Sequence, residues 1–175
     1  MKTSLKLLLF SMLLCIISCK DAQLEKNITM YSNVWDEIIN NGNLDLINDT
    51  NFDTNITLVS NPENIVGIEN FKSYYSNFTT GFSDVEFTIE NIFGQDDNIM
   101  KHWRFKGTNS GEFFGMPATG KSVDVSGVTL VKMKDGKIAQ EQDFMDNLEF
   151  MGQLGIDPFL NPNNSSIIRK LYNDF

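Results

Sequence analysis

The first half of the chain places its apolar residues at helical spacing. Side chains that recur every three or four positions form one face of an α-helix. Two runs follow this rule: Tyr31, Val34, Trp35, Ile38 and Ile39, and then Ile68, Phe71, Tyr74, Tyr75 and Phe78. Asn40-Asn41-Gly42 ends the first run, and Gly81 ends the second. We therefore predict two amphipathic helices, separated by a short helical turn at residues 44–47 and a strand at residues 55–60.

From residue 85 onward the period changes to two, which is typical of strands with one buried face. The alternating apolar residues are Val85, Phe87, Ile89, Ile99, Trp103 and Phe105. Further strands are predicted over residues 123–133 and 138–146. Between them, Asp135-Gly136 is a strong signal of a tight hairpin turn. Residues 107–121 hold four glycines and Pro117, so we predict a long turn there.

A short helix is predicted over residues 147–154, with Leu148, Met151 and Leu154 facing inward. Helices that precede an antiparallel meander indicate an α+β domain, in which the helices cover one face of the sheet. We expect N-terminal helices packed on a curved antiparallel sheet, with an internal pocket between the two layers. The 175-residue chain is long enough for one such domain with its own core.

The N-terminus has the pattern of a bacterial lipoprotein signal. Two lysines precede an apolar stretch, residues 7–17, that is too short to span a bilayer. The stretch ends in Ile16-Ile17-Ser18-Cys19. This run resembles a lipobox, whose cysteine is lipidated and becomes the new N-terminus. An ordinary secretory signal that contains a cysteine is the alternative.

These signals divide the chain into four parts. We predict a signal peptide at residues 1–18, a tether at 19–26, the folded domain at 27–158 and a C-terminal extension at 159–175. Lipidation of Cys19 would anchor the chain in a bacterial cell envelope through several acyl chains. Lys20, rather than Asp, follows the cysteine, and by resemblance to lipoproteins of bacteria with two membranes this permits export to the outer membrane.

Charge and cysteine content exclude several function classes. The formal net charge of −9 disfavours binding to nucleic acid, because an acidic surface repels phosphate. The two cysteines, Cys15 and Cys19, precede the predicted domain, which therefore has no disulfide, thiolate zinc site or cysteine nucleophile. With a single histidine and no carboxylates at ligand spacing, we expect no metal site.

Several segments between residues 66 and 155 carry glycines and aromatic residues at a distinctive spacing. They are VGIENF (66–71), WRFKGT (103–108), GEFFGMPATGK (111–121), DGKI (135–138) and QLG (153–155). Together they resemble the SnoaL-like polyketide cyclase or ester cyclase family, which belongs to the NTF2-like superfamily of cone-shaped α+β folds. The resemblance implies cofactor-free chemistry in an apolar pocket. Asn109 and Gln142 depart from the family, which often has His and Trp at these positions.

Asp146 is the main candidate for a catalytic group. In the family that the chain resembles, an aspartate near the end of the last strand acts as acid and base in an intramolecular aldol ring closure, and Asp146 occupies that position. Phe144, Met145 and Leu148 suggest apolar surroundings, which would bury its carboxyl group. The alternative is a structural role as N-cap of the following helix, where Asp is a favoured residue.

Other candidates have weaker patterns. His102, the only histidine, is a second candidate for acid/base chemistry, although its alternation places it opposite Trp103 and Phe105. We expect the ligand to contact a set of aromatic and polar side chains: Trp103, Tyr74, Phe114, Gln142 and Phe144.

Two classes of function remain open at this point. The first is a cofactor-independent cyclase, of lyase or isomerase type, that acts on a small apolar carbonyl compound. The second is a non-catalytic, membrane-tethered module that binds a hydrophobic small molecule or a protein partner. A fold shared by many functions cannot decide between them. The resemblance, and apolar residues on both faces of residues 123–133, also predict a homodimer formed through the open face of the sheet.

Overall fold

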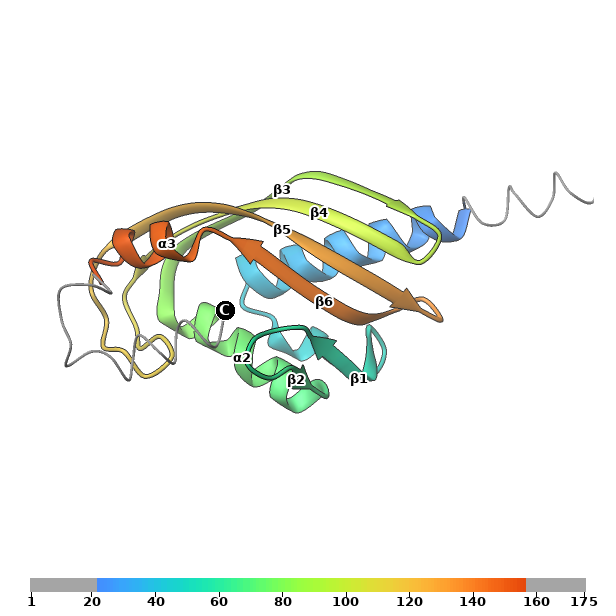
Figure 1. Ribbon diagram of the computed structural model, residues 1–175, viewed down its shortest axis with the longest axis horizontal. Coiled ribbons are helices and arrows are strands. Elements are labelled where there is room, and N and C mark those ends of the chain that lie inside the picture. Colours follow the sequence, from blue (N-terminus) through green and yellow to red (C-terminus); the bar gives the residue numbers. More distant parts are fainter. Residues whose placement is uncertain (1–21, 157–175) are drawn as a thin grey trace, which may run out of the picture.

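A six-stranded sheet arches over two helices in the computed structural model of the chain (Figure 1). The structure describes residues 22–156. The predicted signal peptide, Cys19 and the C-terminal extension lie outside the described residues. The α+β architecture agrees with the fold class that the sequence predicts, with the helices packed on one face of a curved sheet.

The helical layer contains both helices that the apolar spacing predicts. The N-terminal helix occupies residues 22–40, so the described part of the predicted tether is helical. A 3-10 turn, η1 (Leu44–Leu46), follows, and α2 spans Ile68–Gly81. None of the described helices is both long and apolar enough to cross a membrane.

The sheet is mixed, not antiparallel as the sequence predicts. Its order is β2-β1-β6-β5-β4-β3, and β1 runs parallel to β6 while all other neighbours are antiparallel. The bounds are β1 (Phe52–Leu58), β2 (Ile65–Val66), β3 (Phe82–Gln95), β4 (Asn98–Asn109), β5 (Ser122–Lys134) and β6 (Lys137–Met145). The prediction fails because periodicity shows which residues are buried but not which strand lies alongside, or in which direction.

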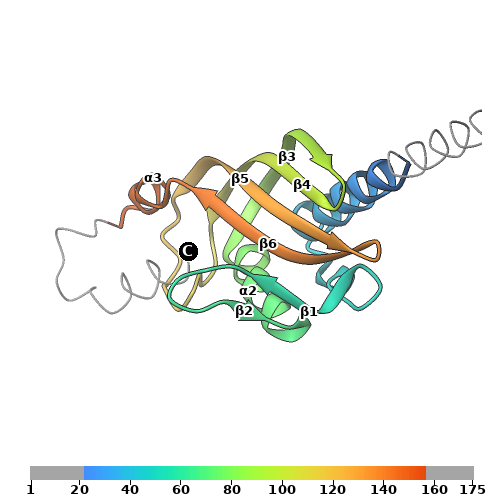
Figure 2. The same cartoon turned by 45° about the vertical axis from the view of Figure 1, so that its right-hand side comes forward.

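The turn between β5 and β6 confirms the hairpin prediction. Asp135 and Gly136 have φ angles of 52° and 77°, and Lys134 pairs with Lys137 across them. A two-residue turn with two positive φ angles matches the right-handed twist of the strands, and Asp-Gly adopts it readily. Figure 2 shows the resulting β5–β6 hairpin beside β1.

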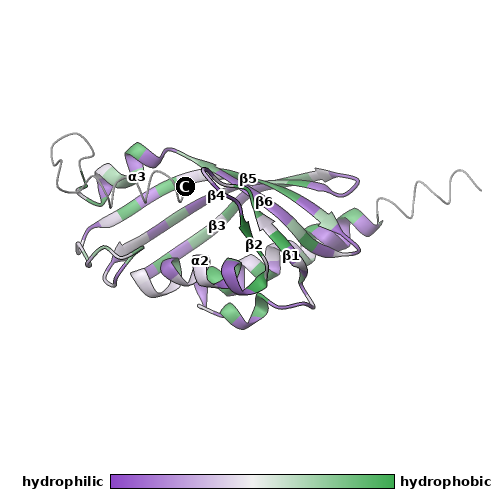
Figure 3. Cartoon of the chain, turned by 60° about the horizontal axis from the view of Figure 1, so that its bottom comes forward, coloured by the Kyte–Doolittle hydropathy of each residue, from purple (hydrophilic) through white to green (hydrophobic). Residues whose placement is uncertain are grey.

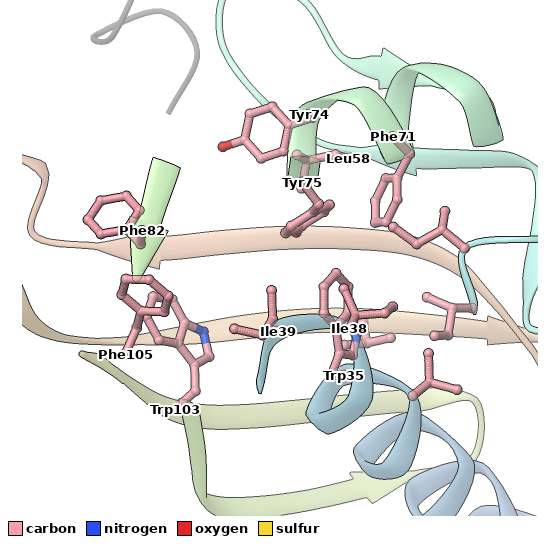
Figure 4. Close-up of a cluster of buried hydrophobic side chains, with 14 of the residues drawn as sticks. Trp35, Ile38, Ile39, Leu58, Phe71, Tyr74, Tyr75, Phe82, Trp103 and Phe105 are labelled. Atoms are coloured by element: carbon pink, nitrogen blue, oxygen red, sulfur yellow. The ribbon is translucent and has the colours of Figure 1, made fainter. Parts of the chain in front are cut away.

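Aromatic side chains fill the space between the layers. The ring centre of Trp35 in the N-terminal helix lies 4.6 Å from that of Tyr75 in α2, and Tyr75 is 4.8 Å from Phe71. In Figure 4 the side chains of the N-terminal helix, Trp35 and Ile38, face those of α2 and β1, Phe71, Tyr75 and Leu58. The colouring by hydropathy in Figure 3 shows hydrophobic and hydrophilic residues alternating along the strands, as expected for a sheet with one covered face.

The closing helix α3 (Asn147–Gln153) docks at one end of the sheet (Figure 1). The Gln153 side chain accepts from the backbone N–H of Asp124 at 2.6 Å and donates to its carbonyl oxygen at 3.1 Å. Met151 and Leu154 are buried, as predicted. Leu148 is 47% exposed, so its predicted inward orientation is wrong: this short helix has room for only a narrow buried stripe.

Candidate functional site

An apolar pocket of about 200 Å³ lies between the sheet and the helical layer. Half of the residues that line it are aromatic, namely Trp35, Tyr74, Tyr75, Phe78, Phe87, Trp103, Phe105, Phe144 and Phe150. The wall also contains two charged side chains, Lys101 and Asp143, and the side-chain amide of Asn147. A mainly apolar cavity with a few polar groups is the usual form of a small-molecule site.

The strand register brings the polar residues into one row. Lys101 of β4 pairs with Thr129 of β5, and Thr129 pairs with Asp143 of β6. All three side chains point to the covered face of the sheet. Trp103, two residues after Lys101 on β4, points to the same face. Three neighbouring strands therefore place an amine, a hydroxyl and a carboxylate side by side under the arch of the sheet.

A chain of two hydrogen bonds connects Trp103 through Thr129 to Asp143. Trp103 Nε1 donates to Thr129 Oγ1 at 2.9 Å, and Thr129 Oγ1 donates to Asp143 Oδ1 at 2.5 Å. The indole lies directly against β5, because a Cβ at Gly127 would come within 2.4 Å of Trp103 Cζ2. Gly127 is thus required for Trp103 to reach Thr129. The second oxygen of Asp143, Oδ2, accepts from the Tyr75 hydroxyl at 3.0 Å.

Behind Asp143 lies a second, fully buried carboxyl group, that of Glu141. Trp35 Nε1 donates to Glu141 Oε1 at 2.8 Å, and the Tyr75 hydroxyl lies 3.3 Å from Glu141 Oε2. Burial raises the pKa of Glu141 to about 7; Lys101 opposes this shift, and the charge of Asp143 adds to it. Glu141 can therefore carry a proton near neutral pH.

Two phenols face these carboxyl groups. Burial, followed by the charges of Asp143 and Glu141, raises the pKa of Tyr75 well above its ordinary value, so Tyr75 stays a hydrogen-bond donor. Burial and the charge of Glu141 do the same to the pKa of Tyr31. The Tyr31 hydroxyl is near enough to Glu141 to respond to its charge, yet has no hydrogen-bond partner of ordinary geometry among the described residues.

Lys101 lies in a cage of aromatic rings. Its side chain is 4% exposed, and its Nζ lies 4.7 Å from the ring centre of Trp35, 5.1 Å from Tyr31 and 5.3 Å from Phe87. Burial lowers the pKa of Lys101, against the attraction of the Glu141 and Asp143 charges. The site therefore combines a perturbed amine with a carboxylate in the pocket wall, Asp143, and a buried carboxyl group behind it, Glu141, a pattern that often marks functional sites.

Asp146 lies outside this group. Its carboxylate is exposed, accepts the Glu149 backbone N–H at 2.9 Å and caps α3. The expected burial of Asp146 is wrong, because its neighbours Phe144 and Leu148 are themselves half exposed. The geometry agrees with the capping alternative, and an acid/base role for Asp146 stays a prediction.

The remaining predicted site residues divide between the two faces of the sheet. His102 is on the open face, with Nδ1 3.3 Å from Glu90 Oε2, opposite the buried Trp103. Trp103 and Tyr74 line the pocket. Phe144 borders it but is 50% exposed.

Neither Phe114 nor Gln142 is part of the pocket wall. Phe114 packs behind it, 5.2 Å from the Tyr74 ring, and Gln142 pairs with Leu130 on the open face. Asn109 is also structural: its Nδ2 donates to the carbonyl oxygens of Gly81 and Gly111 and its Oδ1 accepts from Thr119, so it braces the loop after β4.

Sequence reasoning missed Lys101, Thr129, Glu141 and Asp143. A signal for Lys101 was available, because it occupies an inward position between Ile99 and Trp103 in a strictly alternating strand. A charged residue at such a position has to be accommodated by the core. Within residues 22–156 no group of three or more His, Cys, Asp or Glu side chains could hold a metal ion.

The chain has recognisable relatives. A model of the SnoaL-like polyketide cyclase family matches residues 28–154. A solved structure described as a SnoaL-like polyketide cyclase from Jannaschia sp. CCS1 shares 25% identity, with a TM-score of 0.69 over 77% of this chain and 95% of its own. A comparison with curated proteins finds no match.

Two further structures share the fold at lower identity. TsrD from Streptomyces laurentii is 23% identical, with a TM-score of 0.66 over 74% of this chain and 95% of its own. AclR from Streptomyces galilaeus, described as a hydroxylase, is 18% identical, with a TM-score of 0.66 over 85% of this chain and 92% of its own. Because these descriptions differ, function has to be argued from the pocket itself.

Proposed function

Since the chain belongs to the SnoaL-like polyketide cyclase family, we propose that its pocket binds a small apolar carbonyl compound and that Asp143 exchanges a proton with it. The proposal rests above all on one observation: Asp143 is the carboxylate that lines an otherwise largely aromatic pocket. A base held in an apolar cavity lies within reach of the carbon next to a bound carbonyl group, where protons are acidic.

The hydrogen bonds to Asp143 favour this role. Thr129 and Tyr75 each hold one of its oxygens, so the carboxylate has a fixed orientation without losing its remaining lone pairs. Tyr75 also contacts Glu141, whose pKa of about 7 allows it to hold or release a proton. We infer that Glu141 and Tyr75 adjust the protonation of Asp143 during a reaction cycle.

The reaction class that fits is an intramolecular aldol closure without a cofactor. Asp143 takes a proton from the carbon beside one carbonyl group, and the C–H electron pair forms an enolate. The enolate carbon attacks a second carbonyl carbon of the same molecule, forming a C–C bond. The resulting alkoxide then recovers a proton from Asp143. Atoms and charge balance, and the carboxylate is regenerated.

The proposed location is the bacterial cell envelope. Its support is the Ile16-Ile17-Ser18-Cys19 run, which lies outside the described residues. A lipid anchor would hold the pocket near a membrane, where apolar compounds accumulate.

Exchange of α-protons for deuterium tests the proposal without knowledge of the substrate. The protein is incubated in D₂O with cyclohexanone, and deuterium uptake is followed by mass spectrometry. We expect faster uptake than in buffer, and a loss of about 10²–10⁴-fold of that acceleration in Asp143→Asn. Asp146→Asn is the matched control, because it makes the same change three residues away and outside the pocket.

Binding without exchange favours the second class of function. Ligands retained from a lipid or metabolite extract can be identified by mass spectrometry. If the protein retains an apolar compound but Asp143→Asn changes neither exchange nor turnover, the domain is a binding module and the cyclase proposal is wrong.

A further inference from the structure

We propose that the side-chain amine of Lys101 captures a carbonyl ligand in the pocket as an imine. This inference rests on the proposed function for its ligand class, an apolar aldehyde or ketone. It goes further in naming the residue that activates the carbonyl group, and it adds covalent catalysis to the acid/base chemistry of Asp143.

The position of Lys101 carries the argument. Lys101 is an inward residue of β4 and lines the pocket together with Trp35 and Phe87. The rings of these two residues are also the ones that flank its Nζ, at 4.7 and 5.3 Å from their centres. The amine therefore sits at a part of the pocket walled by aromatic rings, where the carbonyl group of an apolar ligand can approach it.

The contacts of Nζ are unusual for a lysine with a purely structural role. Buried lysines normally form an ion pair or hydrogen bonds, because burying an ammonium group alone is costly. Among the described residues, Nζ has ring faces as neighbours and feels Glu141 and Asp143 only through their charges. Its lone pair, once deprotonated, is not committed to another group.

The surroundings balance two protonation states. The carboxyl groups of Glu141 and Asp143 and the rings of Tyr31, Trp35 and Phe87 favour the ammonium form. Burial favours the neutral amine and is the dominant influence, so the pKa of Lys101 is lowered. The Tyr31 and Tyr75 phenols stay neutral in this range, because their pKa values are raised. A desolvated lysine in an apolar pocket is the usual form of an imine-forming nucleophile.

The step balances without an oxidant or reductant. The neutral amine attacks the carbonyl carbon, and one of its two N–H protons passes to the carbonyl oxygen, giving a neutral carbinolamine. A proton from the Asp143–Tyr75–Glu141 group then reaches the hydroxyl oxygen, which leaves as water as the C–O bond breaks, and the nitrogen lone pair forms the C=N bond of a protonated imine. The imine draws electrons from the adjacent carbon, whose proton Asp143 can remove to give an enamine. Water later reverses the capture.

Reductive trapping tests the inference directly. The folded protein is incubated at pH 7 with benzaldehyde and sodium cyanoborohydride, which reduces an imine to a stable benzylamine, and the labelled lysines are located by peptide mass spectrometry. We expect Lys101 to be labelled faster than the exposed Lys132 of β5 by about tenfold or more, because the pocket concentrates and orients the aldehyde. In urea this preference should vanish.

Two variants serve as controls. Lys101→Met keeps the apolar stem and removes the amine, so it should lose the fast label, whereas Lys132→Met should keep it. Labelling of Lys101 in the folded wild-type protein at or below the rate of Lys132 overturns the inference, whether or not the variants fold.

The outcome separates this inference from the proposed function. If Asp143→Asn abolishes deuterium exchange while Lys101 stays unlabelled, the acid/base proposal stands and imine capture is wrong. If Lys101 is labelled and Asp143→Asn leaves deuterium exchange unchanged, imine capture by Lys101 stands and the acid/base role of Asp143 is wrong.

Discussion

The Tyr75 hydroxyl lies 3.0 Å from Asp143 Oδ2 and 3.3 Å from Glu141 Oε2, so a single phenol links the pocket carboxylate to the buried one. Asp143 reaches the cavity, whereas Glu141 lies behind it and is completely buried. The link offers a path by which a proton taken from a ligand can be passed to a group that holds it near neutral pH.

Removal of this link should slow proton exchange more than it harms the fold. Tyr75→Phe keeps the ring contacts with Trp35 and Phe71 and deletes the shared donor. We expect the acceleration of deuterium exchange to fall by about 10²-fold, with a loss of about 1–3 kcal/mol in unfolding free energy from buried acceptors left unpaired. Tyr31→Phe is the control, and equal effects of both changes would refute the proposed role.

The raised pKa of Glu141 predicts a stability profile that falls with rising pH. Between the ordinary value of 4.5 and about 7, the unfolded chain has released this proton while the folded protein still holds it. Unfolding free energy should therefore decline through this window and level off above it, by up to about 3 kcal/mol from this group. Urea titrations at pH 5 and pH 8 measure the decline.

Glu141→Gln identifies the source of that decline. The amide keeps an acceptor for Trp35 Nε1 but does not titrate. The variant should lose most of the wild-type difference between pH 5 and pH 8. If the difference in unfolding free energy between pH 5 and pH 8 is as large in Glu141→Gln as in the wild type, other groups cause it.

Asp146 should behave as a helix cap. Asp146→Ala removes the acceptor for the Glu149 N–H and should cost about 1 kcal/mol, whereas Asp146→Asn should be nearly neutral. Neither change should affect deuterium exchange. Thermal unfolding and the exchange assay check both statements, and a large loss of exchange in Asp146→Asn would restore the catalytic role that the sequence suggests.

The open face of the sheet predicts a dimer. Leu130 is 44% exposed at its centre, Phe93 and Phe144 are half exposed nearby, and the strand register aligns Leu130 with Met100 and Gln142. Exposed apolar side chains that gather on one face often mark a protein–protein contact. Leu130→Glu should shift residues 20–175 from dimer to monomer in light scattering, whereas Val66→Glu, a similarly exposed residue on β2, should not. A monomeric wild-type protein at micromolar concentration contradicts the prediction.

The N-terminal sequence predicts a lipid on Cys19. Mass spectrometry of the protein isolated from a bacterial host should find the mature chain starting at an acylated Cys19, and Cys19→Ala should leave uncleaved precursor. A mature N-terminus elsewhere, without a lipid, would show that the segment is an ordinary secretory signal.

Local patterns in the sequence were sufficient for most of the elements and for the α+β class, but not for the mixed pairing of the sheet. Both helices, the long strands and the Asp135-Gly136 hairpin follow from period and turn chemistry, which act between residues close in the chain. Two-residue β2 was missed, because it is too short to show a period. The family resemblance likewise depends on local motifs, and the family match over residues 28–154 agrees with it.

The tertiary structure alone decided the site. Lys101, Thr129 and Asp143 are separated by many residues and meet only because β4, β5 and β6 pair in one register. The family resemblance singled out Asp146 and overlooked Asp143, which the structure places in the pocket wall. Asp143 points inward and Asp146 lies beyond the strand, where it caps a helix, because the pleat and the end of β6 fix the direction of each side chain.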